Sequence, residues 1–411
     1  MSNHNKHKIL NDPVYGFITI QHTLSFDLMD HPYVQRLRRI SQLGLSHLVY
    51  PGAVHNRFHH AIGSLHLMQE AIAVLRAKGT AISDSEAEGV CAAILLHDIG
   101  HGPFSHALEH SIVKGVHHED ISTLIMARLN EVFNGALDTA IAIFNDHHPK
   151  KFLHQLVSSQ LDMDRMDYLA RDSFYSGVAE GKIGSERIIK MLAVEDNELV
   201  VEEKGIYSIE KFLMARRLMY WQGYLHRTVL CAEFMLMTAL KRAKDLAQQG
   251  AEIHASPALR AFIYTSFDGT RFFADEAILD QFCLLDDSDI LAALKVWQFH
   301  EDFVLSEVSR RIIHRDLLRI DLRPEAFGEG ELHSLVERTA AHYGIPKAEA
   351  EYFVINDRID NKLYEAGGIT IRFKNGTKAD FADASDQLSR EILMRTVAKS
   401  FVCYPKELGA S

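Results

Sequence analysis

Histidine and aspartate stand side by side at His97 and Asp98, directly after an uninterrupted apolar segment that we expect to be a helix. Gly100 allows the chain to leave this helix sharply, and two more histidines, His101 and His106, follow. The helix would therefore deliver an imidazole and a carboxylate at its end, close to further imidazoles. These groups are ligands for divalent ions such as Fe, Mn, Ni, Zn or Mg, and the ligand types alone do not choose among them.

Two other motifs carry the same kinds of side chain. His59 and His60 precede an apolar helical pattern. Asp164, Tyr168 and Asp172 are spaced four apart, which places them on one face of a helix as a polar stripe. Taken singly, a His-Asp pair is typical of a helix end with a satisfied histidine, and a polar stripe is typical of a solvated face. Together, the motifs favour a metal-containing active site.

A further stripe, Arg216, Tyr220 and Tyr224, repeats the four-residue spacing on a separate helical segment. Taken alone, it is typical of the polar side of an amphipathic surface helix. Its interpretation depends on what lies beside it in the fold.

The composition narrows the class of protein. Of 411 residues, 47% are hydrophobic and 24% are charged, and no apolar run is long enough to span a bilayer, so we expect no membrane segment and a cytoplasmic location. The net charge of -11 opposes general nucleic-acid binding, which needs a basic surface. Histidine occurs 24 times, which directs attention to metal or acid–base chemistry. The four cysteines stand far apart and are expected to be buried thiols: Cys91, Cys231, Cys283 and Cys403.

The fold class is expected to be mainly α, because apolar residues recur at helical spacing up to about residue 325. The segments that each contain one or more helices are 61–75, 85–97, 121–133, 152–171, 210–246 and 291–313. A short strand at 15–20 and hairpins at 198–207 and 369–381 interrupt this pattern, and the last contains Asn375-Gly376, a type I′ turn signal. The pattern predicts a helical core at 1–330 with a smaller C-terminal α+β region at 331–411 packed on it.

Histidine, then His-Asp, then a distant aspartate resembles the H…HD…D signature of the HD superfamily, whose members mostly hydrolyse phosphate esters and anhydrides. The matching residues are His60, His97, Asp98 and Asp164. These HD motifs lie between residues 50 and 180, and further matching segments are 11–13, 35–44, 51–58, 97–106 and 162–172. With these segments, the chain resembles the deoxynucleoside triphosphate triphosphohydrolases, in the branch that includes the SAM-and-HD-domain enzyme.

This resemblance implies roles for particular residues. One divalent metal ion would be ligated by His60, His97, Asp98 and Asp164. Arg57, Arg165 and Arg216 would hold the triphosphate, because the rigid guanidinium offers paired donors to phosphate oxygens. Three histidines and a carboxylate that orients one of them would surround the α-phosphate and provide the general acid: His101, His106, His118 and Glu109.

The deoxynucleoside is assigned by the same resemblance. It would be contacted by Gln42, Leu43, Tyr168, Asp172, Tyr220 and Tyr224. Among these, Asp172 and Gln42 would bind the 3′-hydroxyl, packing by Tyr168 would disfavour a 2′-hydroxyl, and the other two tyrosines would flank the base. Tyr220 replaces a histidine of the best-known relative, so the base preference is left open.

The implied reaction is attack of a metal-polarised water on the α-phosphorus, which gives deoxynucleoside and intact triphosphate. The dNTP substrate could bring Mg with its triphosphate. Two alternatives stay open: an HD enzyme for another nucleotide, such as a nucleotidase or phosphodiesterase, and a nucleotide sensor without turnover. The complete set of four ligands argues against the sensor.

Members of this branch commonly form dimers or tetramers and respond to nucleotides at separate sites. The resemblance therefore implies a homo-dimer or homo-tetramer, with GTP or a dNTP as a possible activator. The positions that would read a regulatory nucleotide are Lys8, Asp30, Gln35 and Arg38. The alternative is that Arg36, Arg38 and Arg39 form the solvated side of a helix.

Overall fold

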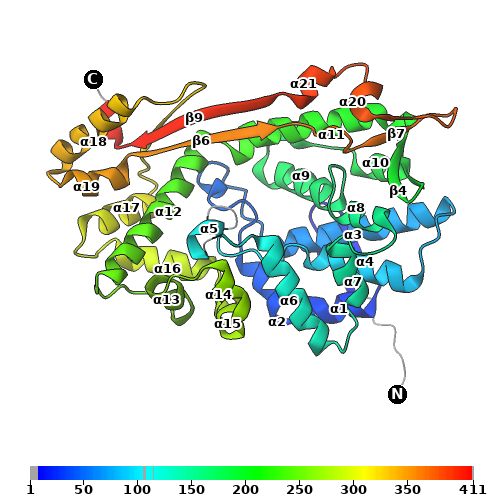
Figure 1. Ribbon diagram of the computed structural model, residues 1–411, viewed down its shortest axis with the longest axis horizontal. Coiled ribbons are helices and arrows are strands. Elements are labelled where there is room, and N and C mark those ends of the chain that lie inside the picture. Colours follow the sequence, from blue (N-terminus) through cyan, green and yellow to red (C-terminus); the bar gives the residue numbers. More distant parts are fainter. Residues whose placement is uncertain (1–7, 105–107, 114, 410–411) are drawn as a thin grey trace.

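The computed structural model describes residues 8–104, 108–113 and 115–409, and it confirms the mainly α fold (Figure 1). The chain opens with an antiparallel hairpin of β1 (Lys8–Asp12) and β2 (Gly16–Ile20), so the strand expected at 15–20 is present as β2. Among the described residues, no helix combines the length and the apolar character that crossing a bilayer requires.

Two central helices, α3 (Arg57–Ala77) and α4 (Asp84–Leu96), organise the first half of the core. Around them lie α1 (Thr23–Asp30), α2 (Pro32–Arg36), α6 (His118–Val132), α7 (Asp138–Phe144), α8 (Lys151–Val157) and α9 (Met163–Ser176). Every residue from 91 to 96 in α4 is 0% exposed, because this helix packs against α1, α3, α7 and α8. Burial on all sides explains its uninterrupted apolar sequence.

The helix α3 begins before the predicted residue 61, because Asn56 caps it. The Asn56 side chain accepts a hydrogen bond from the His59 amide at 3.2 Å, and His59 Nδ1 accepts one from the Asn56 amide at 3.2 Å. This reciprocal cap satisfies two backbone donors that a helix start leaves unpaired. It places Arg57 and His60 in the first turn of α3, where both side chains are buried.

The helices α3 and α9 approach each other closely at Gly63. A Cβ atom on this residue would lie 2.0 Å from Oδ1 of Asp167 and 2.1 Å from Nη2 of Arg171, so a larger residue would displace both side chains. Arg171 donates hydrogen bonds to Asp167 at 2.9 Å and to Asp12 of β1 at 2.7 Å. The N-terminal hairpin, α3 and α9 therefore meet at one buried ion network.

The helical segment predicted at 152–171 is divided into α8 and α9 by a turn. Asp162 ends this turn, because its carboxylate accepts hydrogen bonds from the amides of Ser159 and Arg165, both at 2.7 Å. Aspartate is a preferred residue at the start of a helix for this reason. The cap begins α9 at the next residue and places Asp164 in its first turn.

The helical segment predicted at 210–246 is also divided. The α-helix α11 (Ile206–Met219) is followed by a π-helical turn (Tyr220–Tyr224) and then by α12 (Arg227–Gln248). The stripe of Arg216, Tyr220 and Tyr224 is therefore not on one regular α-helix. A π turn winds more residues into each turn, so it rotates Tyr224 away from the register that four-residue spacing predicts, and such turns are frequent at functional sites.

The remaining helices complete the core and the C-terminal region. They are α5 (Glu109–Ile112), α10 (Ser185–Met191), α13 (Pro257–Tyr264), α14 (Gly269–Ala274), α15 (Glu276–Leu284), α16 (Asp287–Trp297), α17 (Phe303–Ile313), α18 (Glu329–Tyr343), α19 (Lys347–Ala350), α20 (Phe381–Ala384) and α21 (Arg390–Met394). Each segment between residues 61 and 313 that was predicted to be helical therefore contains one or more helices.

Two further sheets join strands from both sides of residue 330. One has the order β3 (Leu192–Glu195), β4 (Glu198–Glu202), β7 (Thr370–Arg372) and β8 (Lys378–Asp380), and the other β5 (Arg319–Arg323), β9 (Thr396–Tyr404) and β6 (Ile355–Lys362). The long strands β6 and β9 run side by side from the end that carries α18 and α19 towards α20 and α21 (Figure 1). The division of the chain at residue 330 stays a prediction.

The turn chemistry differs from the sequence prediction. Gly376 has a φ of 84°, but Asn375 does not have the positive φ that a type I′ turn needs, so that prediction is wrong. Consecutive positive φ values of 51° and 66° occur at Asp196 and Asn197, in the two-residue connection between β3 and β4. The hairpin predicted at 198–207 therefore begins earlier, at residue 192, and residue 206 already belongs to α11.

Candidate active site

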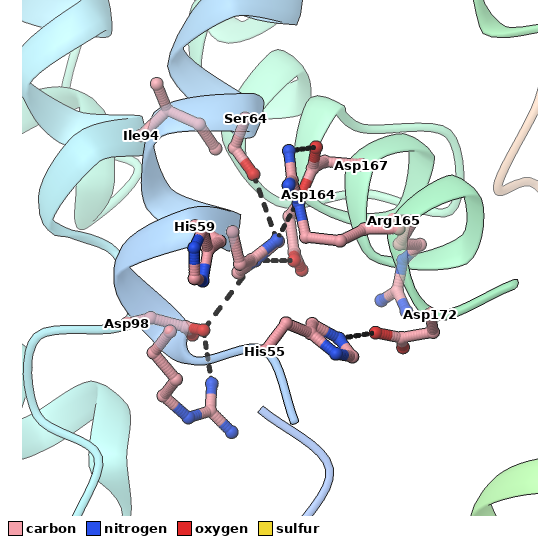
Figure 2. Close-up of polar contacts among 12 residues, drawn as sticks. His55, His59, Ser64, Ile94, Asp98, Asp164, Arg165, Asp167 and Asp172 are labelled. Carbon is pink, nitrogen blue, oxygen red and sulfur yellow. Dashed lines mark hydrogen bonds and ion pairs between the residues drawn. The ribbon is translucent and has the colours of Figure 1, made fainter. Parts of the chain in front are cut away.

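The four predicted metal ligands converge from three parts of the fold: His60 from α3, Asp164 from α9, and His97 with Asp98 from the chain after α4. Asp98 and Asp164 are labelled in Figure 2. Nε2 of His60 lies 3.2 Å from Nε2 of His97, 3.0 Å from Oδ1 of Asp164 and 3.7 Å from Oδ2 of Asp98. Nε2 of His97 lies 3.4 Å from an oxygen of each aspartate. Ligands bonded to one ion at about 2.1 Å lie about 3.0–3.4 Å apart in octahedral or tetrahedral geometry. His60, His97 and Asp164 therefore have the spacing of ligands to a single ion, and Asp98 lies somewhat farther from His60.

Hydrogen bonds on the far side of each ring orient both imidazoles. Nδ1 of His60 lies 2.7 Å from Oδ2 of Asp167, and Nδ1 of His97 lies 2.6 Å from the carbonyl oxygen of Ile94. Carboxylate and carbonyl oxygens only accept, so each Nδ1 carries a hydrogen and each Nε2 faces the ligand cluster. Two Nε2 atoms and carboxylate oxygens that face one another suit a cation between them, whether a proton or a metal ion, and the donor set fits a divalent metal ion.

The electrostatics of the cluster favour positive charge. Burial lowers the pKa of His60, but hydrogen bonds to Asp164 and Asp167 outweigh it and raise the pKa to about 10. Burial raises the pKa of Asp164, but its hydrogen bonds to His60 and His97 outweigh burial and hold the pKa below its usual value. Both shifts have the same origin, since basic and acidic groups are packed together out of water.

A second group of potential ligands lies beside these three residues and contains Asp98, the remaining predicted ligand. It consists of Asp98, His101 and His118, whose ligand atoms are close enough together to hold a metal ion. Oδ1 of Asp98 lies 3.3 Å from Nε2 of His101, which stacks on His118 with 3.8 Å between ring centroids. Arg57 forms an ion pair with Asp98. Burial and the charge of Arg57 hold the pKa of His101 well below its usual range, so this imidazole is neutral.

A cavity of about 420 Å³ opens beside these residues, within the ~300–1,000 Å³ typical of small-molecule sites. The sequence-predicted residues that line it are Gln42, Leu43, Arg57, Asp98, His101, His118, Asp164, Arg165, Tyr168, Asp172, Tyr220 and Tyr224. The stripe of Asp164, Tyr168 and Asp172 is therefore a cavity wall and not a solvated face. Tyr220 and Tyr224 bring the π-helical turn into the same cavity.

Some predicted residues lie elsewhere or cannot be placed. Arg216 is not among the residues that line the cavity, and its guanidinium carbon lies 5.8 Å from the ring centroid of Tyr220. His106 and the side chain of Glu109 lie outside the described part of the structure. Arg165 lines the cavity with its Nε anchored 2.5 Å from the Ser159 carbonyl oxygen.

Three residues near the site were missed by the sequence analysis. Asp167 orients His60, and its signal was its position between Asp164 and Arg171 on one helix. His55 lies 2.7 Å from Asp172, inside a segment that the family resemblance had already matched. Glu233 of α12 lines the cavity, and burial raises its pKa to about 8. No spacing pattern connects this glutamate with the other residues.

The four predicted regulatory residues form two contacting pairs. Nζ of Lys8 lies 2.9 Å from Oδ1 of Asp30, and Nε of Arg38 donates to Oε1 of Gln35 at 2.8 Å. The guanidinium carbon of Arg38 lies 3.6 Å from the ring centroid of Phe58. A uniformly solvated arginine face is excluded by the neighbouring Arg36, which is 1% exposed. Its guanidinium donates to the carbonyl oxygens of residues 99, 101 and 285 and thereby holds the chain after α4.

Comparisons with known proteins agree with this arrangement. Residues 57–172 match the HD domain family, and residues 183–256 match the HD associated region. A crystal structure of a phosphohydrolase from Bacteroides thetaiotaomicron is 53% identical, with a TM-score of 0.94 over 97% of this chain and 100% of that one. The uncharacterized protein YwfO of Bacillus subtilis is 35% identical over 87% of this chain and 81% of its own length.

A third relative is human deoxynucleoside triphosphate triphosphohydrolase SAMHD1, which is 29% identical over 58% of this chain and 45% of its own length. The chain thus matches less than half of that human protein. The matched HD segment begins at Arg57 and ends at Asp172, so it contains the four predicted metal ligands and the whole polar stripe of Asp164, Tyr168 and Asp172. The resemblance that the motifs indicated is confirmed, and the chain belongs to the HD-domain family of phosphohydrolases.

Proposed function

We propose that this protein hydrolyses deoxynucleoside triphosphates at the α-phosphate and releases deoxynucleoside and intact triphosphate. One observation carries the proposal. Asp164, Tyr168 and Asp172 line a single cavity that extends from the metal ligands to the two tyrosines of the π-helical turn. In a nucleotide, the phosphates, the sugar and the base follow one another. The phosphates would lie at the metal ligands, the sugar at the polar stripe and the base at the two tyrosines.

The phosphate end is proposed to use arginine. Arg57 and Arg165 both line the cavity, and each is held by a carboxylate: Arg57 by Asp98, and Arg165 by Asp162 at 3.2 Å. Anchored guanidiniums are oriented before the anion binds, which favours charge stabilisation in the transition state. A divalent ion held by the cluster would supply a water of lowered pKa and positive charge at the phosphoryl oxygens.

Proton transfer to the leaving oxygen is proposed for the segment after α4. His101 and His118 lie at the cavity wall as a stacked pair, and neutral His101 is available as a hydrogen-bond partner for a phosphoryl group. His106, oriented by Glu109, is proposed as the general acid on the family resemblance alone. The departing group would then leave as a neutral 5′-hydroxyl.

The sugar end is proposed to lie against Tyr168, Asp172 and Gln42. Oε1 of Gln42 is buried, and no described residue pairs with it, which suits an oxygen that receives a ligand hydroxyl. The rings of Tyr220 and Tyr224 meet edge to face at 5.1 Å and 88°, and they are proposed to flank the base.

Product analysis tests this function. The purified protein, with its metal content measured, is incubated with each dNTP and NTP, and the products are separated by ion-pair chromatography. Deoxynucleoside and triphosphate are expected, and His60→Ala and Asp164→Ala should abolish both. The matched control is His333→Ala, whose side chain is 66% exposed. Release of pyrophosphate or monophosphate would reject the proposal and favour another HD phosphohydrolase activity.

Nucleotide activation and homo-oligomer formation form a separate part of the proposal. Lys8, Asp30, Gln35 and Arg38 combine cationic, acidic and amide groups in two adjacent pairs, as recognition of a guanine nucleotide such as GTP requires. Activation of one dNTP's hydrolysis by GTP, or a sigmoidal rate curve, would support it, together with a nucleotide-dependent change in particle mass. Hyperbolic kinetics with every pure dNTP, unaffected by GTP, would reject it.

A further inference from the structure

His55 joins two residues that come from distant parts of the chain. Its Nε2 lies 2.7 Å from Oδ1 of Asp172, and the two side chains face each other directly (Figure 2). Its backbone carbonyl oxygen accepts a hydrogen bond from the Gln42 amide at 3.1 Å. Asp172 and Gln42 both line the cavity, whereas His55 lies behind them and is 1% exposed.

The ring of His55 is held in one orientation. It stacks on Tyr175 with 4.4 Å between centroids and 13° between planes. The carboxylate of Asp172 only accepts, so Nε2 carries the hydrogen that this contact uses. Nδ1 is buried and has no hydrogen-bond partner among the described residues. Among the described residues, Asp172 is therefore the side-chain hydrogen-bond partner of the His55 ring.

Asp172 is fixed from two sides. Oδ1 accepts from His55, and Oδ2 accepts from the Tyr224 hydroxyl at 2.7 Å. One donor on each oxygen sets the plane of the carboxylate and leaves its remaining lone pairs for a ligand. Oε1 of Gln42, whose backbone the same histidine holds, is buried without a described partner. A carboxylate held in this way can accept the single hydrogen of a ligand hydroxyl group, whose oxygen can in turn accept a hydrogen bond from the side-chain amide of Gln42.

We propose that His55 is a positioning residue that sets Asp172 and Gln42 to bind the 3′-hydroxyl of the substrate sugar. The inference rests on the proposed function, because it takes a deoxynucleotide as the ligand of this cavity. It adds that selection for the 3′-hydroxyl depends on a buried imidazole that touches neither substrate nor metal. Discrimination between substrates with and without this hydroxyl should therefore change when His55 changes.

The test compares each dNTP with its 2′,3′-dideoxy analogue in wild type, His55→Leu and His55→Gln. His55→Leu should lower kcat/KM for the dNTP by about 10- to 100-fold and change kcat/KM for the analogue by less than about threefold. The preference for the 3′-hydroxyl should therefore fall, whereas the contact with the Gln42 amide remains, because every residue at position 55 keeps its backbone carbonyl oxygen. Gln places an amide nitrogen the same number of bonds from the backbone as Nε2 of histidine, so His55→Gln should restore most of the preference.

Controls separate positioning from a general effect on folding. Tyr175→Phe keeps the ring that stacks on His55 and should leave both rates and their ratio unchanged, and metal content should be equal in all variants. The role of His55 would be overturned if His55→Leu lowered kcat/KM equally for both substrates or lost its metal. It would also be overturned if the wild type hydrolysed both substrates equally well. If wild type releases no triphosphate from any dNTP, the proposed function itself fails, and this inference fails with it. Wild-type turnover with an unaltered ratio in His55→Leu rejects the inference alone.

Discussion

Nδ1 of His60 lies 2.7 Å from Oδ2 of Asp167, and that carboxylate is held in turn by Arg171 at 2.9 Å. The relationship fixes which nitrogen of His60 faces the cluster. Carboxylates that orient a ligating histidine commonly raise metal affinity about 10- to 100-fold. Three residues on two helices therefore act together on one ligand atom.

Asp167→Asn is expected to weaken metal binding by about 10- to 100-fold, because an amide is a poorer acceptor for the Nδ1 hydrogen. Competition with a chromophoric chelator measures the affinity, and elemental analysis measures the metal retained after purification. The matched control is Asp146→Asn at an exposed position, which should leave the affinity unchanged. Equal affinities in the two variants would contradict the role of Asp167.

Arg171→Met is expected to lower the free energy of unfolding by about 3–5 kcal/mol, because it leaves buried carboxylates without their counter-charge. The side chain of Arg171 is 0% exposed and donates to both Asp167 and Asp12. Urea denaturation measures the change. Arg390→Met, which removes an ion pair at a half-exposed position, should lower the free energy of unfolding far less, because solvent screens an exposed ion pair. Similar costs at the two positions would show that the buried network contributes little.

Tyr168→Ala is expected to reduce discrimination against ribonucleotides by about 10-fold or more, if the ring occupies the space of a 2′-hydroxyl. Tyr168 lines the cavity, with its ring centroid 6.1 Å from that of Tyr224 and 6.4 Å from that of His60. The ratio of kcat/KM for dATP to that for ATP is the measurement. Tyr168→Phe keeps the ring and should retain the ratio, and an unchanged ratio in Tyr168→Ala would place the sugar elsewhere.

Glu233→Gln is expected to stabilise the protein relative to wild type progressively between about pH 5 and pH 8. Burial raises the pKa of Glu233 from 4.5 to about 8, so the folded state keeps a proton that the unfolded state releases near pH 4.5. The unfolded state is therefore increasingly favoured in wild type as the pH rises through this window, and the neutral amide removes this loss. Above about pH 8 the difference in Tm should be constant. A difference in Tm that does not vary from pH 5 to pH 9 would contradict the raised pKa.

The histidines and aspartates that meet in the cluster could be predicted from the sequence because their signal is local. His97 and Asp98 follow an apolar helix, and the four-residue spacing from Asp164 to Asp172 survives because α9 is a regular helix. The four-residue spacing does not extend regularly from Arg216 to Tyr224, because a π-helical turn changes the register after Met219. Periodicity also could not predict where helical segments break, since a single capping carboxylate sets the start of α9.

Contacts between distant segments were beyond sequence reasoning for a different physical reason. The pairing of His55 with Asp172 and the burial of Arg36 depend on how the helices pack. His55 and Arg36 do not belong to a periodic pattern in the sequence. An arginine beside other arginines is typical of a solvated face. Arg36 is buried because backbone carbonyl oxygens of other segments accept its hydrogen bonds.

The missing side chain at Gly63 makes the assembly of the candidate metal site depend on complete folding. Because α3 and α9 touch at this point, any opening that separates the two helices removes Asp164 and Asp167 from His60 in a single event. A bound ion would oppose such opening by mass action, since the open form lacks the assembled ligands. Protection of backbone amides in these two helices against hydrogen exchange should therefore rise when metal is added, and metal retention reports whether the helices are docked.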